Sequence, residues 1–382
     1  GEPARVFVAP RDPQMLAPAD VDGDGTLDLL TATYAGHRVL LFSLNRDEPI
    51  VVMDGAEGAI DASAADMDAD GDMDVLAAAF RDDAVYVIQN VSSDGELAFS
   101  EPIAMPGEVK GALLAQPADV NGDGQLDVVA VSRIDGEIVW FENRSASGGF
   151  KFAEAQPIAN SFGGLEAVIV ADLDGDGDPD VGSADYRDDT VAWHENTGDG
   201  TFTTHIVDDA ATGVIAVAAA DVDGDGLRDM LASTATNDRV VWYRQMPRDS
   251  TDTGPARFGE AQLVSDSVHE PESIAVVDHD GDNDVLSASF RSGIVAWHEN
   301  LGEGTFGARH IITRNAPEAL AVLPVDLDGD GDVDIAAASQ GNDRITWFEN
   351  AIRSVRPSTE PAASDTTDST STEATSPEAP ES

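Results

Sequence analysis

Short apolar segments rich in valine, leucine and isoleucine recur along the chain, and polar turns separate them. One such segment is 167–170, and others follow acidic loops, as at 128–129 and 230–231. Segments of this length and composition, bounded by turn residues, are typical of β-strands. No stretch combines a helical period with helix caps. The pattern therefore predicts an all-β protein.

Each repeating unit contains four predicted strands. An apolar strand leads into an acidic loop, a second strand leaves the loop, a third carries a Val-x-Trp pattern, and a fourth often opens near a Gly/Phe pair. The third-strand pattern and its near variants lie at 139–141, 191–193, 241–243, 295–297 and 345–347. Four antiparallel strands per unit form one blade of a β-propeller.

The acidic loop has the pattern Asp-x-Asp-x-Asp-Gly-x-x-Asp, and the chain holds seven complete or near copies of it. The copies begin at Asp20, Asp66, Asp119, Asp172, Asp221, Asp278 and Asp326. A repeat of about 50 residues indicates either a stacked array or a closed propeller.

The two ends of the chain favour a closed ring. The last repeat supplies three strands, whereas residues 5–8 form an extra apolar segment before the first inner strand. Pairing the two would hide the edges that an open sheet exposes. We therefore expect a seven-bladed β-propeller over residues 1–356, with four-stranded antiparallel blades and a ring closed by the N-terminal strand. Residues 357–382, rich in Ser, Thr, Pro and Glu, are expected to form a disordered tail or linker.

The acidic loops suit calcium. We number each loop from its first aspartate, so that positions 1, 3, 5 and 9 carry acids and position 6 is glycine, which permits a sharp turn. Position 7 can offer its backbone carbonyl. An all-oxygen set of about five protein ligands plus water suits Ca²⁺ better than Mg²⁺, which demands strict octahedral geometry. Zinc and copper would favour nitrogen or sulfur ligands.

The predicted metal ligands number four or five in each loop, and we expect six or seven calcium ions per chain. The ligands are Asp20, Asp22, Asp24, Thr26 and Asp28; Asp66, Asp68, Asp70, Asp72 and Asp74; Asp119, Asn121, Asp123, Gln125 and Asp127; Asp172, Asp174, Asp176, Asp178 and Asp180; Asp221, Asp223, Asp225, Leu227 and Asp229; Asp278, Asp280, Asp282 and Asp284; and Asp326, Asp328, Asp330, Asp332 and Asp334.

Two loops depart from the pattern. Asn121 is a neutral ligand and predicts a slightly weaker third site. The sixth loop, 278–284, is two residues short. Aligned on its last acid, its aspartates take positions 3, 5 and 9; aligned on its first acid, it lacks the closing ligand. An EF-hand is excluded, because position 12 lacks the required glutamate in the first five loops and the flanks are strand-like.

Charge and composition exclude several classes of function. The formal net charge is −52, which opposes binding to nucleic acid or anionic lipid, even with seven calcium ions bound. Cysteine is absent, so the chain has no disulfides and no thiolate sites. No apolar run approaches the length of a transmembrane helix.

The loops, the Phe-Gly elements and the strand order resemble FG-GAP/VCBS repeats, such as those of the integrin α-subunit head, over roughly residues 4–350. The resemblance implies a seven-bladed propeller with calcium in hairpin loops on one face, in a secreted or cell-surface protein. Members of this family serve in adhesion, in carbohydrate binding and as accessory domains of polysaccharide-active enzymes. We therefore expect a monomeric adhesion or ligand-binding module with an extracellular protein or carbohydrate partner, and not an enzyme.

The sequence leaves two questions open: which surface binds the ligand, and whether the protein has an enzymatic activity. The turns between second and third strands carry aromatic–arginine pairs at 80–81, 186–187 and 290–291, with Tyr34 and Arg133 at related places. Such groups suit sugars or proteins, although the arginines could simply pair with Asp83 or Asp188. The tryptophans are interpreted as core residues rather than sugar platforms. No nucleophile motif occurs, but a lyase-type polysaccharide-active enzyme, or its accessory domain, is the alternative function.

Overall fold

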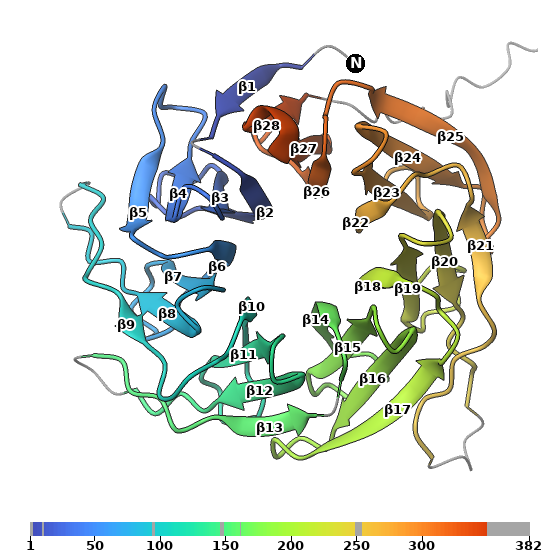
Figure 1. The fold of residues 1–382 in the computed structure, drawn as a ribbon, viewed down its shortest axis with the longest axis horizontal. Coiled ribbons are helices and arrows are strands. Elements are labelled where there is room, and N and C mark those ends of the chain that lie inside the picture. Colours follow the sequence, from blue (N-terminus) through green and yellow to red (C-terminus); the bar gives the residue numbers. More distant parts are fainter. Residues whose placement is uncertain are drawn as a thin grey trace, which may run out of the picture.

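The computed structural model describes residues 3–9, 11–93, 96–145, 149–160, 162–248 and 254–349. Seven four-stranded antiparallel sheets are arranged as blades around a central axis (Figure 1). The seven-bladed propeller predicted from the repeats is thus confirmed. The predicted tail, 357–382, lies outside the described residues.

The strands occupy equivalent places in every blade. The inner strands are β2 (Pro13–Ala19), β6 (Ala59–Ala65), β10 (Ala112–Ala118), β14 (Leu165–Ala171), β18 (Val214–Ala220), β22 (Pro271–Asp278) and β26 (Ala319–Val325). The second strands are β3 (Asp28–Thr33), β7 (Asp74–Ala79), β11 (Asp127–Ser132), β15 (Asp180–Asp185), β19 (Asp229–Thr234), β23 (Asn283–Ser289) and β27 (Asp334–Ser339). The third strands are β4 (Arg38–Phe42), β8 (Ala84–Ile88), β12 (Glu137–Phe141), β16 (Thr190–Asn196), β20 (Arg239–Tyr243), β24 (Ile294–Asn300) and β28 (Arg344–Phe348). The outer strands are β5 (Ile50–Asp54), β9 (Ile103–Ala104), β13 (Gln156–Ala159), β17 (Phe202–Asp208), β21 (Gln262–Ser265), β25 (Phe306–Thr313) and, in the last blade, β1 (Arg5–Val8).

Within the described residues the helical structure is limited to the short 3₁₀ turn η1 (Gln340–Asn342). The absence of helices beside the acidic loops agrees with the exclusion of an EF-hand. No helix among these residues has the length and apolar character needed to cross a membrane.

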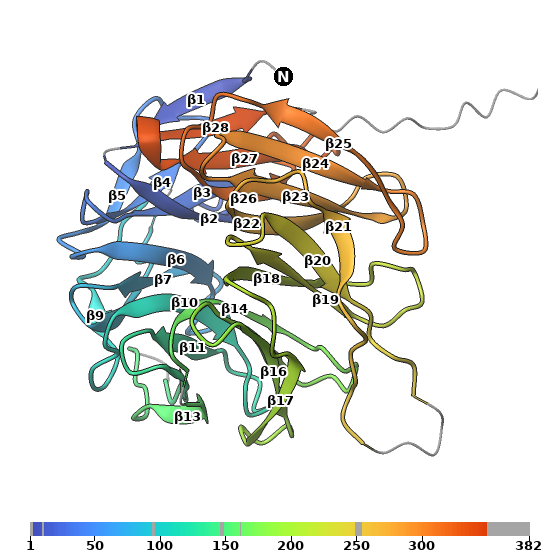
Figure 2. The same cartoon turned by 45° about the vertical axis from the view of Figure 1, so that its right-hand side comes forward.

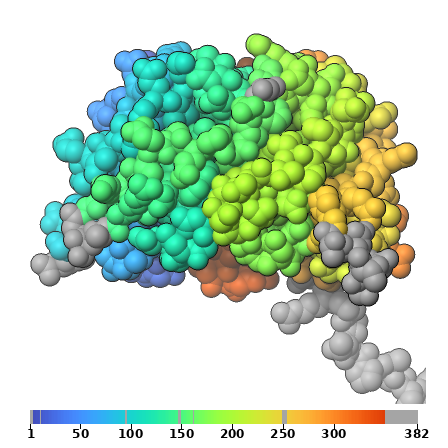
Figure 3. All heavy atoms as spheres, turned by 90° about the horizontal axis from the view of Figure 1, so that it is seen from below, coloured from blue at the N-terminus to red at the C-terminus, as the bar shows by residue number. Residues whose placement is uncertain are grey.

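The core consists of seven apolar clusters, one between each pair of neighbouring blades. Successive side chains of a strand point to opposite faces, so the second strands contribute to two clusters each. Leu29 packs toward the last blade and its neighbour Leu30 toward the second. This double burial explains why almost every residue of the second strands is buried, including their serines and threonines. Neighbouring blades form one continuous surface in the space-filling view (Figure 3).

The N-terminal strand closes the ring. Strand β1 pairs antiparallel with β28, with Arg5 opposite Trp347 and Val8 opposite Arg344. Phe7 is buried and its ring lies 5.2 Å from that of Phe42 in the first blade. The blue first strand and the red last strands accordingly lie side by side in both ribbon views (Figures 1 and 2). This closure is the one that the sequence predicted.

Four of the five recurrent tryptophans are core residues, as predicted, whereas Trp297 is only partly buried and stacks on His310. Trp140, Trp193, Trp242 and Trp347 are at most 7 % exposed, and each belongs to a cluster shared with the next blade around the ring. His194 is also buried, but it bonds mainly within its own blade, to Ser183 and Thr204. Its contact beyond the blade is an edge-on approach to Phe162.

Candidate metal centres

The seven acidic loops lie on one face of the propeller. Each loop connects an inner strand to the second strand of the same blade. In six blades the residue before position 1 pairs directly with position 9, as Ala19 pairs with Asp28 and Ala65 with Asp74. Because all inner strands run in the same direction along the propeller axis, all the loops emerge on the same face of the propeller. The register therefore presents every loop as the tip of an equivalent hairpin.

The position 9 aspartate anchors the loop. One of its oxygens, Oδ2, accepts the backbone N–H of position 2 in six loops, at 2.8 to 3.2 Å. In five loops Oδ1 accepts a backbone N–H at the end of the third strand, at 2.7 to 2.9 Å. Burial raises the pKa of Asp74 to about 6 and that of Asp180 to about 7. A bound cation would oppose this shift by stabilising the ionised carboxylate.

The position 1 aspartate fixes the turn. Its Oδ2 accepts the N–H of the position 6 glycine in six loops, at 2.8 to 3.1 Å. Gly25 adopts a φ of 88°, a conformation that favours glycine over residues with a side chain. The glycine in the pattern is therefore explained by the backbone. In five loops the turn brings the carboxylates at positions 1 and 3 together with the one at position 5 or 9.

Five loops bring three carboxylates together, with one oxygen of each lying within 4.8 Å of the others. The groups are Asp20, Asp22 and Asp28; Asp66, Asp68 and Asp70; Asp172, Asp174 and Asp180; Asp221, Asp223 and Asp225; and Asp326, Asp328 and Asp334. Positions 1 and 3 occur in all five, and position 5 or 9 completes each. The third loop has acids at positions 1, 5 and 9 but the amide Asn121 at position 3, and it is not among the five groups.

Several of these oxygens are buried without a hydrogen-bond partner. They include Oδ1 of Asp20, Asp28, Asp68 and Asp326. A buried, unpartnered carboxylate oxygen is costly, and a hard cation that takes oxygen ligands would satisfy it. The donor set therefore fits calcium in the first, second and seventh loops. Positions 1 and 3 would supply protein ligands in all three, joined by position 9 in the first and seventh loops and by position 5 in the second.

The position 7 residues do not join these groups. Asp72 and Asp332 are exposed, and the Thr26 hydroxyl donates to Asp24 at 2.5 Å. Position 7 is predicted to coordinate the ion through its backbone carbonyl oxygen, and the positions of the side chains do not test that prediction. The assignment of each predicted ligand to a bound ion therefore stays a prediction.

The sixth loop is shortened at its tip, and neither end alignment considered from the sequence describes it. Val277 pairs with Asp284, just as Ala19 pairs with Asp28, so Asp278 takes position 1 and Asp284 takes position 9. Asp284 is buried and accepts the N–H of Asn300 at 2.7 Å, like the other position 9 acids. Gly281 donates to Asp278 at 2.8 Å across a tighter turn. The closing acid is present, but the sixth loop is not among those that gather three carboxylates.

The sequence matches the model of the FG-GAP-like repeat at residues 20–77, 66–130, 119–183, 172–232 and 277–337. Each match begins at or beside one acidic loop, runs through the whole of the next loop and ends in the second strand that follows it. The chain belongs to the FG-GAP-like repeat family. The resemblance inferred from the loops is thereby confirmed at the level of an FG-GAP propeller.

Solved structures share the fold of this FG-GAP propeller. An Agrocybe aegerita lectin, described in terms of its specific recognition of non-reducing terminal N-acetylglucosamine, is 22 % identical with a TM-score of 0.54, over 80 % of this chain and 81 % of the lectin. A Lactobacillus plantarum protein is 14 % identical with a TM-score of 0.55, over 82 % and 88 % of the two chains. No match was found among curated proteins. At these identities the likeness concerns the fold alone.

An asparagine that the sequence reasoning overlooked ties neighbouring loops of the FG-GAP propeller together. At the end of the third strand, Asn143 donates from its side chain to the carbonyl of Met67, in the loop of the preceding blade, at 2.9 Å. Asn196 and Asn300 make the same bond to Val120 and Val222 at 2.8 Å. The recurrent Glu-Asn pair after the third-strand tryptophan was the available signal. Each loop is therefore positioned partly by the blade beside it.

Arginines also reach the acidic loops. Arg244, at the end of β20, places Nε 2.6 Å from Asp223 and a terminal nitrogen 3.0 Å from Asp225 in the fifth loop. Arg248 approaches Asp174 of the fourth loop at 3.5 Å. Glutamates occupy the position equivalent to Arg244 in three other blades. They are Glu142 in the third blade, Glu195 in the fourth and Glu299 in the sixth. The fifth loop thus differs electrostatically from its neighbours.

The face opposite the loops holds the aromatic–arginine turns. The Arg81 guanidinium lies 4.6 Å from the Tyr34 ring centroid, and Tyr34 lies 6.4 Å from Phe80. Arg291 pairs with Glu270 at 3.1 Å. Asp83 and Asp188, the alternative partners considered for these arginines, accept backbone N–H groups of Gly111 and Gly163. The turns of the first and second blades therefore meet in a mixed aromatic and cationic cluster.

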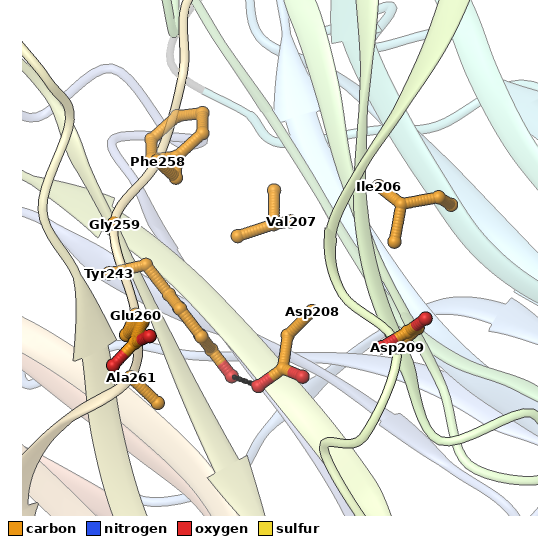
Figure 4. A pocket seen from close by; sticks show the side chains of 9 residues that line it. All are labelled: Ile206, Val207, Asp208, Asp209, Tyr243, Phe258, Gly259, Glu260 and Ala261. Atoms are coloured by element: carbon orange, nitrogen blue, oxygen red, sulfur yellow. Dashed lines mark hydrogen bonds between the residues drawn. The ribbon is translucent and has the colours of Figure 1, made fainter.

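A groove lies between the outer part of the fourth blade and the segment that leads into β21 (Figure 4). It has a volume of about 460 Å³ and is lined by Ile206, Phe258, Asp209 and Glu260, among others. The Tyr243 hydroxyl donates to Asp208 at 2.9 Å in its wall. Aromatic and carboxylate groups in one groove can stack on a sugar ring and accept its hydroxyl protons.

Proposed function

We propose that this FG-GAP propeller is a calcium-loaded, non-enzymatic binding module that captures a carbohydrate or protein ligand at the cell surface or in the extracellular space. The observation that carries the calcium assignment is the set of buried, unpartnered carboxylate oxygens in the loops. Calcium would hold the hairpins of one face, which leaves the turns of the opposite face to contact the ligand. Extracellular modules bind calcium with dissociation constants of about 10⁻⁴ to 10⁻³ M, a range suited to loops as exposed as these.

A carbohydrate is the preferred ligand class. The opposite face offers the Tyr34 and Phe80 rings beside the Arg81 guanidinium, a combination that recognises sugar rings and acidic groups on them. The lectin with the same fold supports testing glycans first. We further propose that the protein acts as a monomer, because the ring already closes upon itself through β1 and β28.

A glycan and matrix-protein array, read with calcium and with EDTA, tests this function. Replacement of Arg81, Arg187 and Arg291 with serine should abolish binding to the ligand found, with calcium content and melting temperature nearly unchanged. Arg144→Ser is the control, since Arg144 pairs with Glu142 near the loop face. Retained affinity of the triple variant would move the site away from this face, and the groove of Figure 4 would be tested next. Turnover of acidic polysaccharides would instead support the enzymatic alternative.

A further inference from the structure

A ring of bulged residues surrounds the propeller axis. Every inner strand shifts register against its second strand at the same place, close to its start. A β-bulge leaves the extra residue outside the ladder and redirects its side chain. The residues at the seven bulges are Gln14 with Met15, Ile60, Leu113, Glu166, Ile215, Glu272 and Leu320, and all of them line an axial cavity of about 710 Å³. The inner strands that carry them face the centre of Figure 1.

Most residues of the cavity wall are apolar, and its charged lining consists of Glu166, Glu272, Asp61, Arg133 and Arg228. Leu114, Val168 and Val217 continue the apolar lining beyond the bulge ring. The two glutamates of the ring, Glu166 and Glu272, belong to the fourth and sixth blades, on either side of Ile215 in the fifth. Their position near the starts of the inner strands places them toward the face opposite the acidic loops. The cavity thus combines an apolar wall with negative charge near one mouth.

The Glu272 carboxylate lacks a cationic partner among the described residues. The nearby arginines are engaged elsewhere, because Arg133 pairs with Glu166 and Arg291 pairs with Glu270. No hydrogen bond or ion pair of the Glu272 side chain is found in the part of the chain that the structure describes. Burial, together with the neighbouring charges of Glu270 and Glu166, raises the pKa of Glu272 to about 7, against a smaller opposing effect of Arg133. A positively charged group from outside would relieve this charge.

We propose that the axial cavity binds a small amphiphilic amine, with its ammonium group at Glu272 and its apolar part against the side chains of the bulge ring. A metal ion is a poorer occupant, since calcium takes six to eight oxygen ligands and the ring supplies two carboxylates, one of them already paired with Arg133. An anionic occupant would add to the repulsion between Glu166 and Glu272. An ammonium group donates hydrogen bonds to a carboxylate and brings the missing positive charge.

The test uses the whole chain with saturating calcium and n-hexylammonium as the probe, followed by calorimetry and by ligand-observed NMR. The wild-type protein should bind one n-hexylammonium saturably, and n-hexanol should bind at least about tenfold more weakly because it lacks the charge. Glu272→Gln should weaken n-hexylammonium at least about tenfold. Ile215→Trp, which fills the cavity between the two glutamates, should abolish binding.

Controls separate this site from the general attraction of a highly acidic protein for cations. Glu101→Gln removes one exposed carboxylate outside the cavity and should leave the affinity unchanged. No saturable n-hexylammonium binding by the wild type, or equal affinity for n-hexanol, would overturn the proposal without the need for any variant. Equal weakening by Glu101→Gln and Glu272→Gln would show nonspecific attraction and would overturn it too. Melting curves identify any variant that fails to fold.

Discussion

At the residue scale, one position of the repeat shows how a single side chain distinguishes otherwise equivalent loops. This position directly follows the last buried residue of the third strand, and its side chain contacts position 3 of the acidic loop in the same blade. In the second blade Gln89 occupies it and donates to Asp68 at 2.7 Å. In the fifth blade Arg244 occupies it and pairs with Asp223 and Asp225. A calcium ion entering the fifth loop must therefore compete with a cation that belongs to the protein.

We predict that Arg244→Gln strengthens calcium binding at the fifth loop several-fold, because glutamine cannot supply the competing positive charge. Calcium titration followed by calorimetry should show one site shifting to higher affinity while the others stay unchanged. Arg239→Gln, at the other end of β20, is the matched control. A titration curve identical to that of the wild type would mean that Arg244 leaves the loop whenever calcium binds, at no measurable cost.

A second prediction at this scale concerns Glu272 and pH. Its pKa is raised from the ordinary value of 4.5 to about 7 in the folded protein, so the folded state binds the proton more tightly than the unfolded state. The carboxylate therefore destabilises the fold above pH 7, and this cost disappears as the pH falls toward 4.5. Glu272→Gln should raise the free energy of unfolding by about 2 kcal/mol at pH 8 and by much less at pH 5.

Denaturant unfolding of the Glu272→Gln variant and the wild type at both pH values, with calcium saturating, measures this difference. Effects of pH on the acidic loops cancel because both proteins share them. Glu101→Gln should give no difference at either pH. An equal stabilisation at pH 5 and pH 8 would show that the substitution acts through packing and not through charge.

At the element scale, β1 decides whether the ring is closed. It supplies the outer strand of the last blade and buries Phe7 against Phe42. Without it the edge of β28 would expose unpaired backbone groups, a known route to aggregation. The equivalent outer strands in other blades are continuous in sequence with their own blades, so none of them has this role in joining the two ends.

We predict that deletion of residues 1–9 produces aggregation or a loss of several kcal/mol in stability. Deletion of residues 357–382 is the control and should change stability little, because that segment is composed mainly of small polar and acidic residues. Size-exclusion chromatography and thermal melts compare the two truncations. A monomeric and equally stable protein lacking residues 1–9 would show that the ring does not depend on this strand.

At the scale of the whole molecule, the acidic loops gather charge on one face of a protein whose net charge is −52. Each loop holds several carboxylates that repel one another, and asparagines such as Asn143 couple each loop to the preceding blade. Ion binding at one loop would therefore be coupled to the neighbouring loop through these hydrogen bonds. Loss of the ions should weaken the ring as a whole and not only the separate hairpins.

We predict that EDTA lowers the melting temperature by about 20 °C at low salt, since each saturated site contributes about 2.7 kcal/mol at a ligand concentration of one hundred times its dissociation constant. High salt should reduce the effect by screening the repulsion between carboxylates. Differential scanning calorimetry with metal analysis checks both statements. An unchanged melting curve in EDTA, or fewer than five calcium ions at saturation, would contradict the assignment of the loops to calcium.

The sequence by itself determined the features that depend on local pattern. The seven acidic runs and their spacing specified the repeat, the short apolar segments specified the strands, and the surplus segment at residues 5–8 specified the closure. These succeeded because a strand and a tight acidic turn are set mainly by neighbouring residues. The loop acids were found in the same way, and the structure gathers three of them in five of the loops.

Only the tertiary structure decided what depends on register and on contacts between distant residues. The pairing of Val277 with Asp284 placed both ends of the sixth loop, which sequence alignment from either end could not do. The approach of Arg244 to the fifth loop follows from the side chains of neighbouring strands and blades, as does the lack of a partner for Glu272 among the residues that the structure describes. The seven bulges meet around one cavity because ring closure brings together residues that are about 50 positions apart in the chain.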